Sequence, residues 1–278
     1  MSLTVFLAVL AAAFLHACWN ALLRVGTSRV AAMMVLSAGQ GVIGLAILMT
    51  RDWSAEGVWP WIVASGLIHT GYQTFLAFAY EHGDLGRVYP LARGSAPMIT
   101  LLVSAIWLAE AVSPLDTAGI LVLGCGIALL AGGVWKSGES RRVLPYAFGS
   151  ALATAGYTMV DGMGARALGD PVTYLAWVMV VAGVAFAAVM LALRGRSSIP
   201  AAPRVWALGA LGAAFSYGGY AVVVWAMTQA PIPLVAALRE TSILFAVLIG
   251  WLALRERMTP AKALSVLMIA AGVALTRL

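Results

Sequence analysis

Ten apolar stretches follow one another along the chain, and short polar links separate them. The stretches cover residues 3–23, 30–49, 58–80, 88–109, 115–135, 143–163, 172–193, 204–228, 232–254 and 260–276. A helix needs about 20 residues to cross the roughly 30 Å hydrocarbon layer of a membrane. The stretches lack the alternation of a membrane β-barrel, so the pattern predicts ten transmembrane helices with no room for a soluble domain.

The composition and the charge distribution agree with this prediction. The chain is 62% hydrophobic and 10% charged, whereas a soluble domain has about 25% charged residues. The links after the odd-numbered stretches hold twelve lysines and arginines, and the other links and the tail hold three. Because cytoplasmic loops carry the Lys/Arg excess, both termini are predicted to face outward. The net charge of +6 is thus a topology signal, and no nucleic-acid partner is expected.

The two halves of the chain match at a fixed offset of 146 residues. The matching pairs are Arg93 and Arg239, Glu110 and Glu256, Pro114 and Pro260, and Gly126 and Gly272. A repeat of five helices inverts the second half in the membrane, which is a common architecture of secondary transporters. We therefore predict two inverted five-helix repeats, residues 1–135 and 143–278, around a central cavity.

The polar content of each stretch predicts its place in the bundle. Stretches 30–49 and 172–193 hold very few polar groups, so we expect them toward lipid or in an outer layer. Gly124, Ala128 and Gly132 form a stripe of small residues that permits close helix contact. Glu110 and Glu256 end their stretches and are predicted to cap helices or to form ion pairs, with gating as the alternative.

Among the charged residues within the apolar stretches, Arg93, Arg239 and Glu240 lie farthest from the stretch ends. An ionised side chain at mid-membrane costs about 2.5–3.5 kcal/mol on insertion scales, so it needs a partner or a wet cavity. Guanidinium presents a fixed fork of donors that suits carboxylate, phosphate or phosphonate. We predict that these residues bind an anionic group of a substrate or form a charged gate. The alternatives are a structural pair between Arg93 and Glu240, or arginines that snorkel to the membrane surface.

Further polar and aromatic residues recur at helical spacing. They are His16, Trp19 and Asn20 in the first stretch, His69, Tyr72, Gln73 and Tyr80 in the third, Tyr157 and Asp161 in the sixth, and Ser216, Tyr217 and Tyr220 in the eighth. Such stripes predict an aromatic, hydrogen-bonding cavity for a small solute, to which we add Tyr89. His16 and His69 are candidates for carrying a coupling proton, since histidine titrates near neutral pH. Ordinary interhelical hydrogen bonding is the alternative for each of these residues.

Enzyme and metal motifs are absent from the sequence. There is no G-x-S-x-G, no H-E-x-x-H, no Walker A loop and no His/Cys cluster with metal-ligand spacing. We therefore predict no enzymatic activity, no cofactor and no metal. The lack of a nucleotide-binding loop argues against a primary pump acting alone.

Several strings resemble the ten-helix, EamA-type branch of the drug/metabolite transporter superfamily. They are HACWNALL, AYEHGDLGRVYPLARGSAP, WLAEAVSPLDTAGILVLGCGIALL and ALRETSILFAVLIGWLALRERMTP. The resemblance implies a basket of helices around a central cavity and secondary transport of small metabolites. Four-helix relatives export cations with a membrane-embedded glutamate in the first helix, where this chain has His16 and Asn20 instead. Export of multidrug cations is therefore not expected.

Together, these patterns predict a secondary active transporter of a small polar metabolite that carries an anionic group. Expected partners are that metabolite, membrane lipid, and protons or a counter-substrate, with the protein as a monomer or weak dimer. The expected location is a bacterial-type inner membrane. A passive channel or facilitator, and a membrane-embedded enzyme or signalling subunit, are the alternatives.

Overall fold

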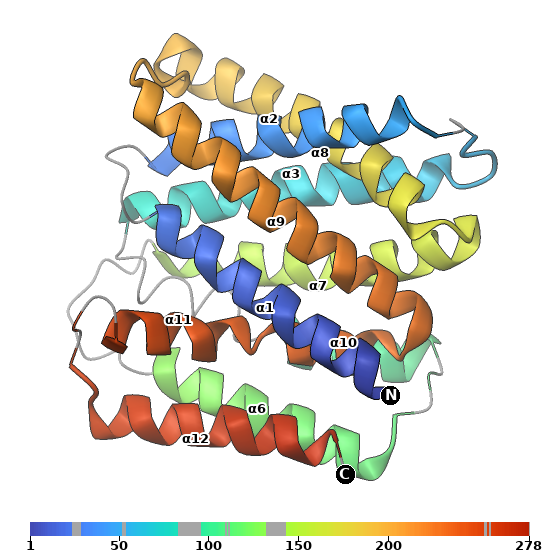
Figure 1. Ribbon diagram of the computed structural model, residues 1–278, viewed down its shortest axis with the longest axis vertical. Coiled ribbons are helices and arrows are strands. Elements are labelled where there is room, and N and C mark those ends of the chain that lie inside the picture. The colour runs from blue at the N-terminus through green and yellow to red at the C-terminus, as the bar shows by residue number, and fades with distance from the viewer. Residues whose placement is uncertain are drawn as a thin grey trace.

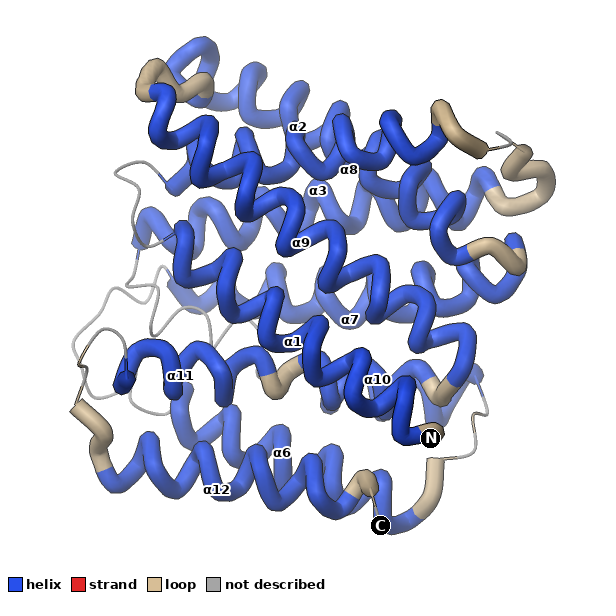
Figure 2. The backbone as a smooth tube through the Cα atoms, viewed as in Figure 1, coloured by secondary structure: helices blue, strands red, loops and turns tan. Residues whose placement is uncertain are grey.

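The chain folds into a bundle of helices, as seen in a computed structural model that describes residues 1–23, 29–51, 54–82, 96–108, 110, 112–131, 143–252, 255 and 257–277. The described residues contain helices and no strands (Figures 1 and 2). The helices of the first half are α1 (Leu3–Leu23), α2 (Arg29–Leu48), α3 (Trp59–His82), α5 (Ala96–Val103), the π-helix η1 (Ser104–Leu108) and α6 (Pro114–Ala131). Those of the second half are α7 (Val143–Leu168), α8 (Pro171–Arg194), the 3₁₀ turn η3 (Gly195–Ser198), α9 (Pro203–Gln229), α10 (Ile232–Arg239), α11 (Ser242–Leu252) and α12 (Pro260–Leu275).

Several of these helices are long and apolar enough for a membrane. Among the described residues, five segments could cross it, namely Leu3–Leu22, Val30–Leu48, Pro171–Ser198, Pro203–Gln229 and Ile232–Leu252. Three shorter apolar helices are Ala96–Ile106, Pro114–Leu130 and Pro260–Leu275. Helices α3 and α7 have 24 and 26 residues, which is also enough to span, but they carry more polar residues. Polar groups of membrane helices face the bundle interior, and those of α3 and α7 do so here.

Helices of one half pack mainly against helices of the other half. Helix α1 packs on α9, α3 on α7, α2 on α8 and α9, and α3 also on α8. Helices α6 and α12 form a further pair along one edge of the bundle (Figure 1). When the first helix of one half is matched with the first of the other, these contacts exchange with one another: the α1–α9 contact corresponds to the α7–α3 contact. The interior between α1, α2, α3, α7, α8 and α9 is therefore built equally by both halves.

The pair of α6 and α12 depends on glycines that allow close approach. A Cβ atom on Gly272 would lie 2.6 Å from the carbonyl oxygen of Gly119 and 2.7 Å from the backbone nitrogen of Leu123. Of the stripe predicted for α6, Gly124 does lie at a close helix contact, against Met98 of α5, whereas Ala128 is exposed. Gly132, the third member of that stripe, lies outside the described residues.

Two helices differ from the predicted stretches. Helix α7 continues to Leu168, five residues beyond the predicted end at 163, so Asp161 lies within the helix. The predicted stretch 232–254 is interrupted between α10 and α11, where the N–H groups of Glu240 and Thr241 donate to the carbonyls of Ala237 and Leu238, both at 3.0 Å. These bonds reach back three residues instead of four, which tightens the backbone at this point. Figure 2 shows the interruption as a short loop segment.

Candidate functional site

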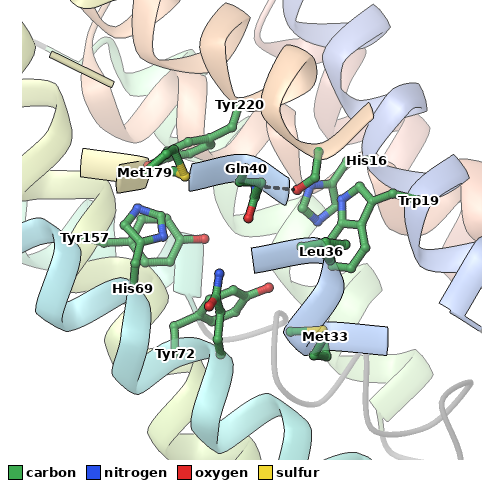
Figure 3. Close-up of a pocket in the computed structure, with 12 residues that line it drawn as sticks. His16, Trp19, Met33, Leu36, Gln40, His69, Tyr72, Tyr157, Met179 and Tyr220 are labelled. Carbon is green, nitrogen blue, oxygen red and sulfur yellow. Dashed lines mark hydrogen bonds between the residues drawn. The ribbon is translucent and has the colours of Figure 1, made fainter. Parts of the chain in front are cut away.

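A small cavity lies between the two halves of the bundle. Its lining residues come from α1, α2, α3, α7, α8 and α9: His16, Trp19, Met33, Leu36, Gln40, His69, Tyr72, Gln73, Tyr157, Met179, Ser216 and Tyr220 (Figure 3). The cavity volume is about 30 Å³, which is room for one or two water molecules. In this conformation the cavity is therefore too small for a metabolite, although its lining is rich in aromatic and hydrogen-bonding groups.

Helices α2 and α8 contribute to this lining, so their predicted place in an outer layer was wrong. Met33, Leu36 and Gln40 of α2 and Met179 of α8 line the cavity. The sequence argument failed because it equated a low polar content with lipid exposure. Small and flexible apolar side chains also pack well inside a bundle, where α2 contacts both α8 and α9.

Several buried polar atoms of the cavity wall have no hydrogen-bond partner within the described residues. The Nε2 atom of Gln40 donates to the Ser216 hydroxyl at 3.0 Å (Figure 3). Within the described part of the chain, Trp19 Nε1, Gln40 Oε1 and Gln73 Oε1 are buried and make no hydrogen bond. A buried polar group without a partner costs about 1–3 kcal/mol. The cavity wall therefore offers both an unused donor and unused acceptors.

Aromatic rings close one side of the cavity. The His69 ring stacks on the Tyr157 ring, with centroids 4.0 Å apart and planes inclined by 19°. Tyr220 contacts both rings edge-on, at 5.4 Å from His69 and 5.7 Å from Tyr157. Tyr72 adds a fourth ring, 5.4 Å from Tyr157. We call these four residues the aromatic floor.

Asp161 lies beyond the aromatic floor and is completely buried. Its Oδ1 atom accepts hydrogen bonds from the hydroxyls of Ser65 and of Tyr174, the latter at 3.1 Å. Its Oδ2 atom accepts from the Tyr220 hydroxyl at 2.5 Å and lies 3.0 Å from Nε2 of His69. The carboxylate therefore joins α3, α7, α8 and α9 at one point. Asp161 belongs to a polar stripe that the sequence indicated, one helical turn after Tyr157.

Arg239 and Glu240 lie at the interruption between α10 and α11, behind the aromatic floor. Arg239 is only 2% exposed and Glu240 is fully buried. The Nη2 atom of Arg239 lies 3.3 Å from Glu240 Oε1 and 3.3 Å from the Thr158 hydroxyl. Its guanidinium carbon is 5.6 Å from the Tyr157 ring centre and 5.9 Å from that of Tyr220, within the range of cation–π attraction. Arg239 is thus inside the protein, and the snorkelling alternative is wrong for it.

The structure brings many of the predicted site residues to the cavity, but not all of them. His16, Trp19, His69, Tyr72, Gln73, Tyr157 and Tyr220 line it. Asn20, Tyr80, Tyr217, Arg239 and Glu240 are buried elsewhere. The Asn20 side chain donates to the His16 carbonyl oxygen at 2.8 Å. Arg93 and Tyr89 lie outside the described residues, as does Glu256. Ser216 of the predicted polar stripe also lines the cavity, and so does Gln40, which was not predicted.

Ion pairs join the halves at the ends of the helices. Arg166 of α7 contacts Glu110 at 2.5 Å and also donates to the carbonyls of Met227 and Ala230 at the end of α9, at 2.8 and 3.0 Å. Glu110 in turn accepts from the backbone N–H of Ile232, the first residue of α10, at 2.8 Å. The prediction that Glu110 caps a helix or forms an ion pair is therefore confirmed on both counts.

A second ion pair on the same face joins α2 to α8. Arg51 contacts Asp170, the residue that caps the N-terminus of α8, at 2.8 Å. Burial raises the pKa of the Asp170 carboxyl, but hydrogen bonds from Thr173 and Val172 and the charge of Arg51 together hold it below its usual value. The opposite face has its own pair, between Arg194 of α8 and Glu81 of α3 at 2.6 Å.

Comparison with known proteins places the chain in a family. It is similar to a solved structure titled "Crystal structure of protein", with 21% sequence identity, a TM-score of 0.76 and coverage of 99% of this chain and 98% of that one. This likeness shows the same fold. The profile of the EamA-like transporter family matches the chain twice, over residues 2–132 and 141–278. The chain therefore belongs to the EamA-like transporter family and is a multi-pass membrane transporter of the drug/metabolite type.

Proposed function

We propose that the protein is a secondary transporter that works by alternating access and carries a small polar metabolite with an anionic group. The observation that carries this proposal is the buried Arg239 at the interruption between α10 and α11. Interrupted membrane helices form the substrate site in many transporters, because their free backbone groups and charges face the solute path. Arg239 is separated from the cavity by Tyr157 and Tyr220, so a shift of either ring brings its guanidinium to the solute.

The exchange of packing contacts between the halves supports ten helices in two inverted repeats. Each half contributes three helices to the cavity wall. A second small cavity, lined by Leu22, Ala32, Val205 and Leu208 among others, shares Trp19 and Leu36 with the first. Its residues lead toward the end of α1 and the start of α9, on the face opposite the termini. Opening along this route would expose the site to one side while Arg166 and Glu110 hold the other side closed.

A carrier accounts for these features better than a passive channel does. The cavity of about 30 Å³ contrasts with a pore, which needs a continuous water-filled path. A membrane-embedded enzyme or signalling subunit would use the same cavity without moving a solute. Coupling to protons or to a counter-substrate provides the driving force in a bacterial-type inner membrane, since the sequence has no nucleotide-binding loop.

The proposal is tested by solute counterflow. Purified protein is first screened by thermal shift with small metabolites that bear a carboxylate, phosphate or phosphonate, each beside a neutral ester or amide analogue. The strongest stabiliser is then used in proteoliposomes, where we expect saturable uptake that is stimulated by the same solute inside. Arg239→Ala should reduce this rate by about ten- to a hundredfold, the loss expected for charge-assisted hydrogen bonds.

The matched control is Arg204→Ala, which removes an exposed arginine at the start of α9. It should transport at the wild-type rate. Equal transport of the neutral analogue, or an unchanged rate in Arg239→Ala, would contradict the anionic substrate. Flux without saturation or stimulation would support a channel, and turnover of a solute without flux would support an enzyme.

A further inference from the structure

Asp161 is a buried carboxylate that an anion-binding role does not use. It has no exposed surface, and three of its four partners are the neutral hydroxyls of Ser65, Tyr174 and Tyr220. The fourth partner is His69, whose Nε2 atom lies 3.0 Å away. An ionised carboxylate in such a buried position needs a positive charge close by, because an isolated buried charge is strongly unfavourable.

The helices packed around Asp161 present several titratable groups. Helix α3 presents His69 to the carboxylate, α8 presents Tyr174 and α9 presents Tyr220, while the described residues of α5 have no titratable group. Helix α10 ends with Arg239, which is followed by Glu240. The guanidinium of Arg239 lies against the rings of Tyr157 and Tyr220, and its Nη2 atom is 3.3 Å from the Glu240 carboxylate. Among the described residues, His69 is the basic side chain that directly contacts Asp161.

We propose that His69 and Asp161 form a proton-binding site, in which His69 carries the proton as imidazolium and Asp161 balances its charge. The pair is neutral as a whole, which is the arrangement that a low-dielectric interior favours. The ring of His69 also faces the cavity, whereas Asp161 does not. The proton therefore has one route of exchange, through the histidine.

The site couples proton movement to transport, and this coupling rests on the function proposed above. When water enters the cavity, the proton passes from a ring nitrogen of His69 to water, and the nitrogen keeps its electron pair. Asp161 is then left with an uncompensated negative charge, which only an open, hydrated cavity tolerates. The cavity closes again when a proton returns, or when a cationic group of the solute takes its place. Proton exchange is thereby tied to opening and closing.

The His69–Asp161 pair lies next to the aromatic floor, and this position links it to Arg239, the proposed anion-binding residue. Tyr220 donates to Asp161 through its hydroxyl while its ring lies beside Arg239. Stacking on Tyr157 fixes the His69 ring in the plane that reaches Asp161. A solute that moves either tyrosine therefore disturbs the proton pair and the arginine together.

The test is nitrogen NMR of protein labelled with ¹⁵N-histidine, which is practical because the chain has only three histidines. The single variants His16→Gln and His82→Gln assign two signals, and the third belongs to His69. At pH 7 we expect an imidazolium signature for His69 in the otherwise wild-type protein. In Asp161→Asn we expect the signature of a neutral imidazole at His69, with the His82 signal unchanged.

A neutral His69 in the wild-type background, or an imidazolium that persists in Asp161→Asn, would overturn the proton site. The wild-type spectrum decides the matter even if Asp161→Asn does not fold. This readout needs no solute, so it separates the two proposals. A neutral His69 with normal counterflow removes the proton site and leaves the carrier, whereas imidazolium without counterflow removes the carrier.

Discussion

At the scale of single residues, two tyrosines of α9 differ in what their hydroxyls do. The Tyr220 hydroxyl donates to Asp161 at 2.5 Å, whereas in the described structure the buried Tyr217 hydroxyl has no hydrogen-bond partner. Tyr220→Phe should therefore lower the free energy of unfolding by about 1.5–3 kcal/mol, the value of a hydrogen bond to a charged group. Tyr217→Phe should be close to neutral. Melting temperatures in one detergent compare the two, and equal shifts would mean that Asp161 does not depend on Tyr220.

Single residues also show which parts of the candidate site could be predicted from the sequence. His69, Gln73 and Tyr157 line the cavity because polar groups in apolar helices face the interior, which their spacing already indicated. Asp161 stands one turn after Tyr157 in a predicted stripe, but this spacing does not show that four side chains from three other helices meet it. Gln40 was missed because one amide in an apolar stretch carries little signal. Only the packing of α2 between α8 and α9 shows where it points.

At the scale of elements, the interruption of the ninth stretch has no breaker residue that could reveal it. Pro231 and Pro233 are at the start of α10, whereas the interruption comes at Glu240 and Thr241. Neither proline nor glycine is involved. The change to i→i−3 hydrogen bonds depends on the buried surroundings of Arg239 and Glu240, which are tertiary contacts. The start of α8 has local chemistry instead, since Asp170 caps the helix directly before Pro171.

The ends of four elements meet at Arg166, and this contact depends on the shape of guanidinium. One arginine bonds Glu110 and two carbonyls at the end of α9, which a lysine cannot do at once. Arg166→Lys should therefore lower the free energy of unfolding by about 1–3 kcal/mol. Arg194→Lys is the control, because Arg194 makes one exposed ion pair with Glu81, worth about 0–1 kcal/mol. Thermal unfolding measures both, and similar losses would show that charge alone matters at Arg166.

At the scale of the whole molecule, the match between halves predicted more than any single motif. Gly272 was one of the four positions that matched at an offset of 146 residues, and it lies where α12 meets α6. The sequence offset predicts such a contact because equivalent helices of the two halves pack against equivalent neighbours. The same offset does not show which glycine faces which helix, so it could not show that Gly124 contacts α5 whereas Gly272 contacts α6.

The termini provide the last test, because the fold fixes them on one face and the charges decide which face that is. Arg277 donates to the carbonyl oxygen of Met1 at 3.3 Å, so both ends lie together. The opposite face receives the links with twelve of the lysines and arginines, against three in the links and tail on the termini's face. Because basic links stay in the cytoplasm, alkaline phosphatase fused after Leu278 should be active, and a fluorescent protein fused there should be dark. The same reporters inserted after Arg196 should give the reverse result. A fluorescent C-terminal fusion would show that the termini face the cytoplasm. The route between α1 and α9 would then open to the outer side of the membrane.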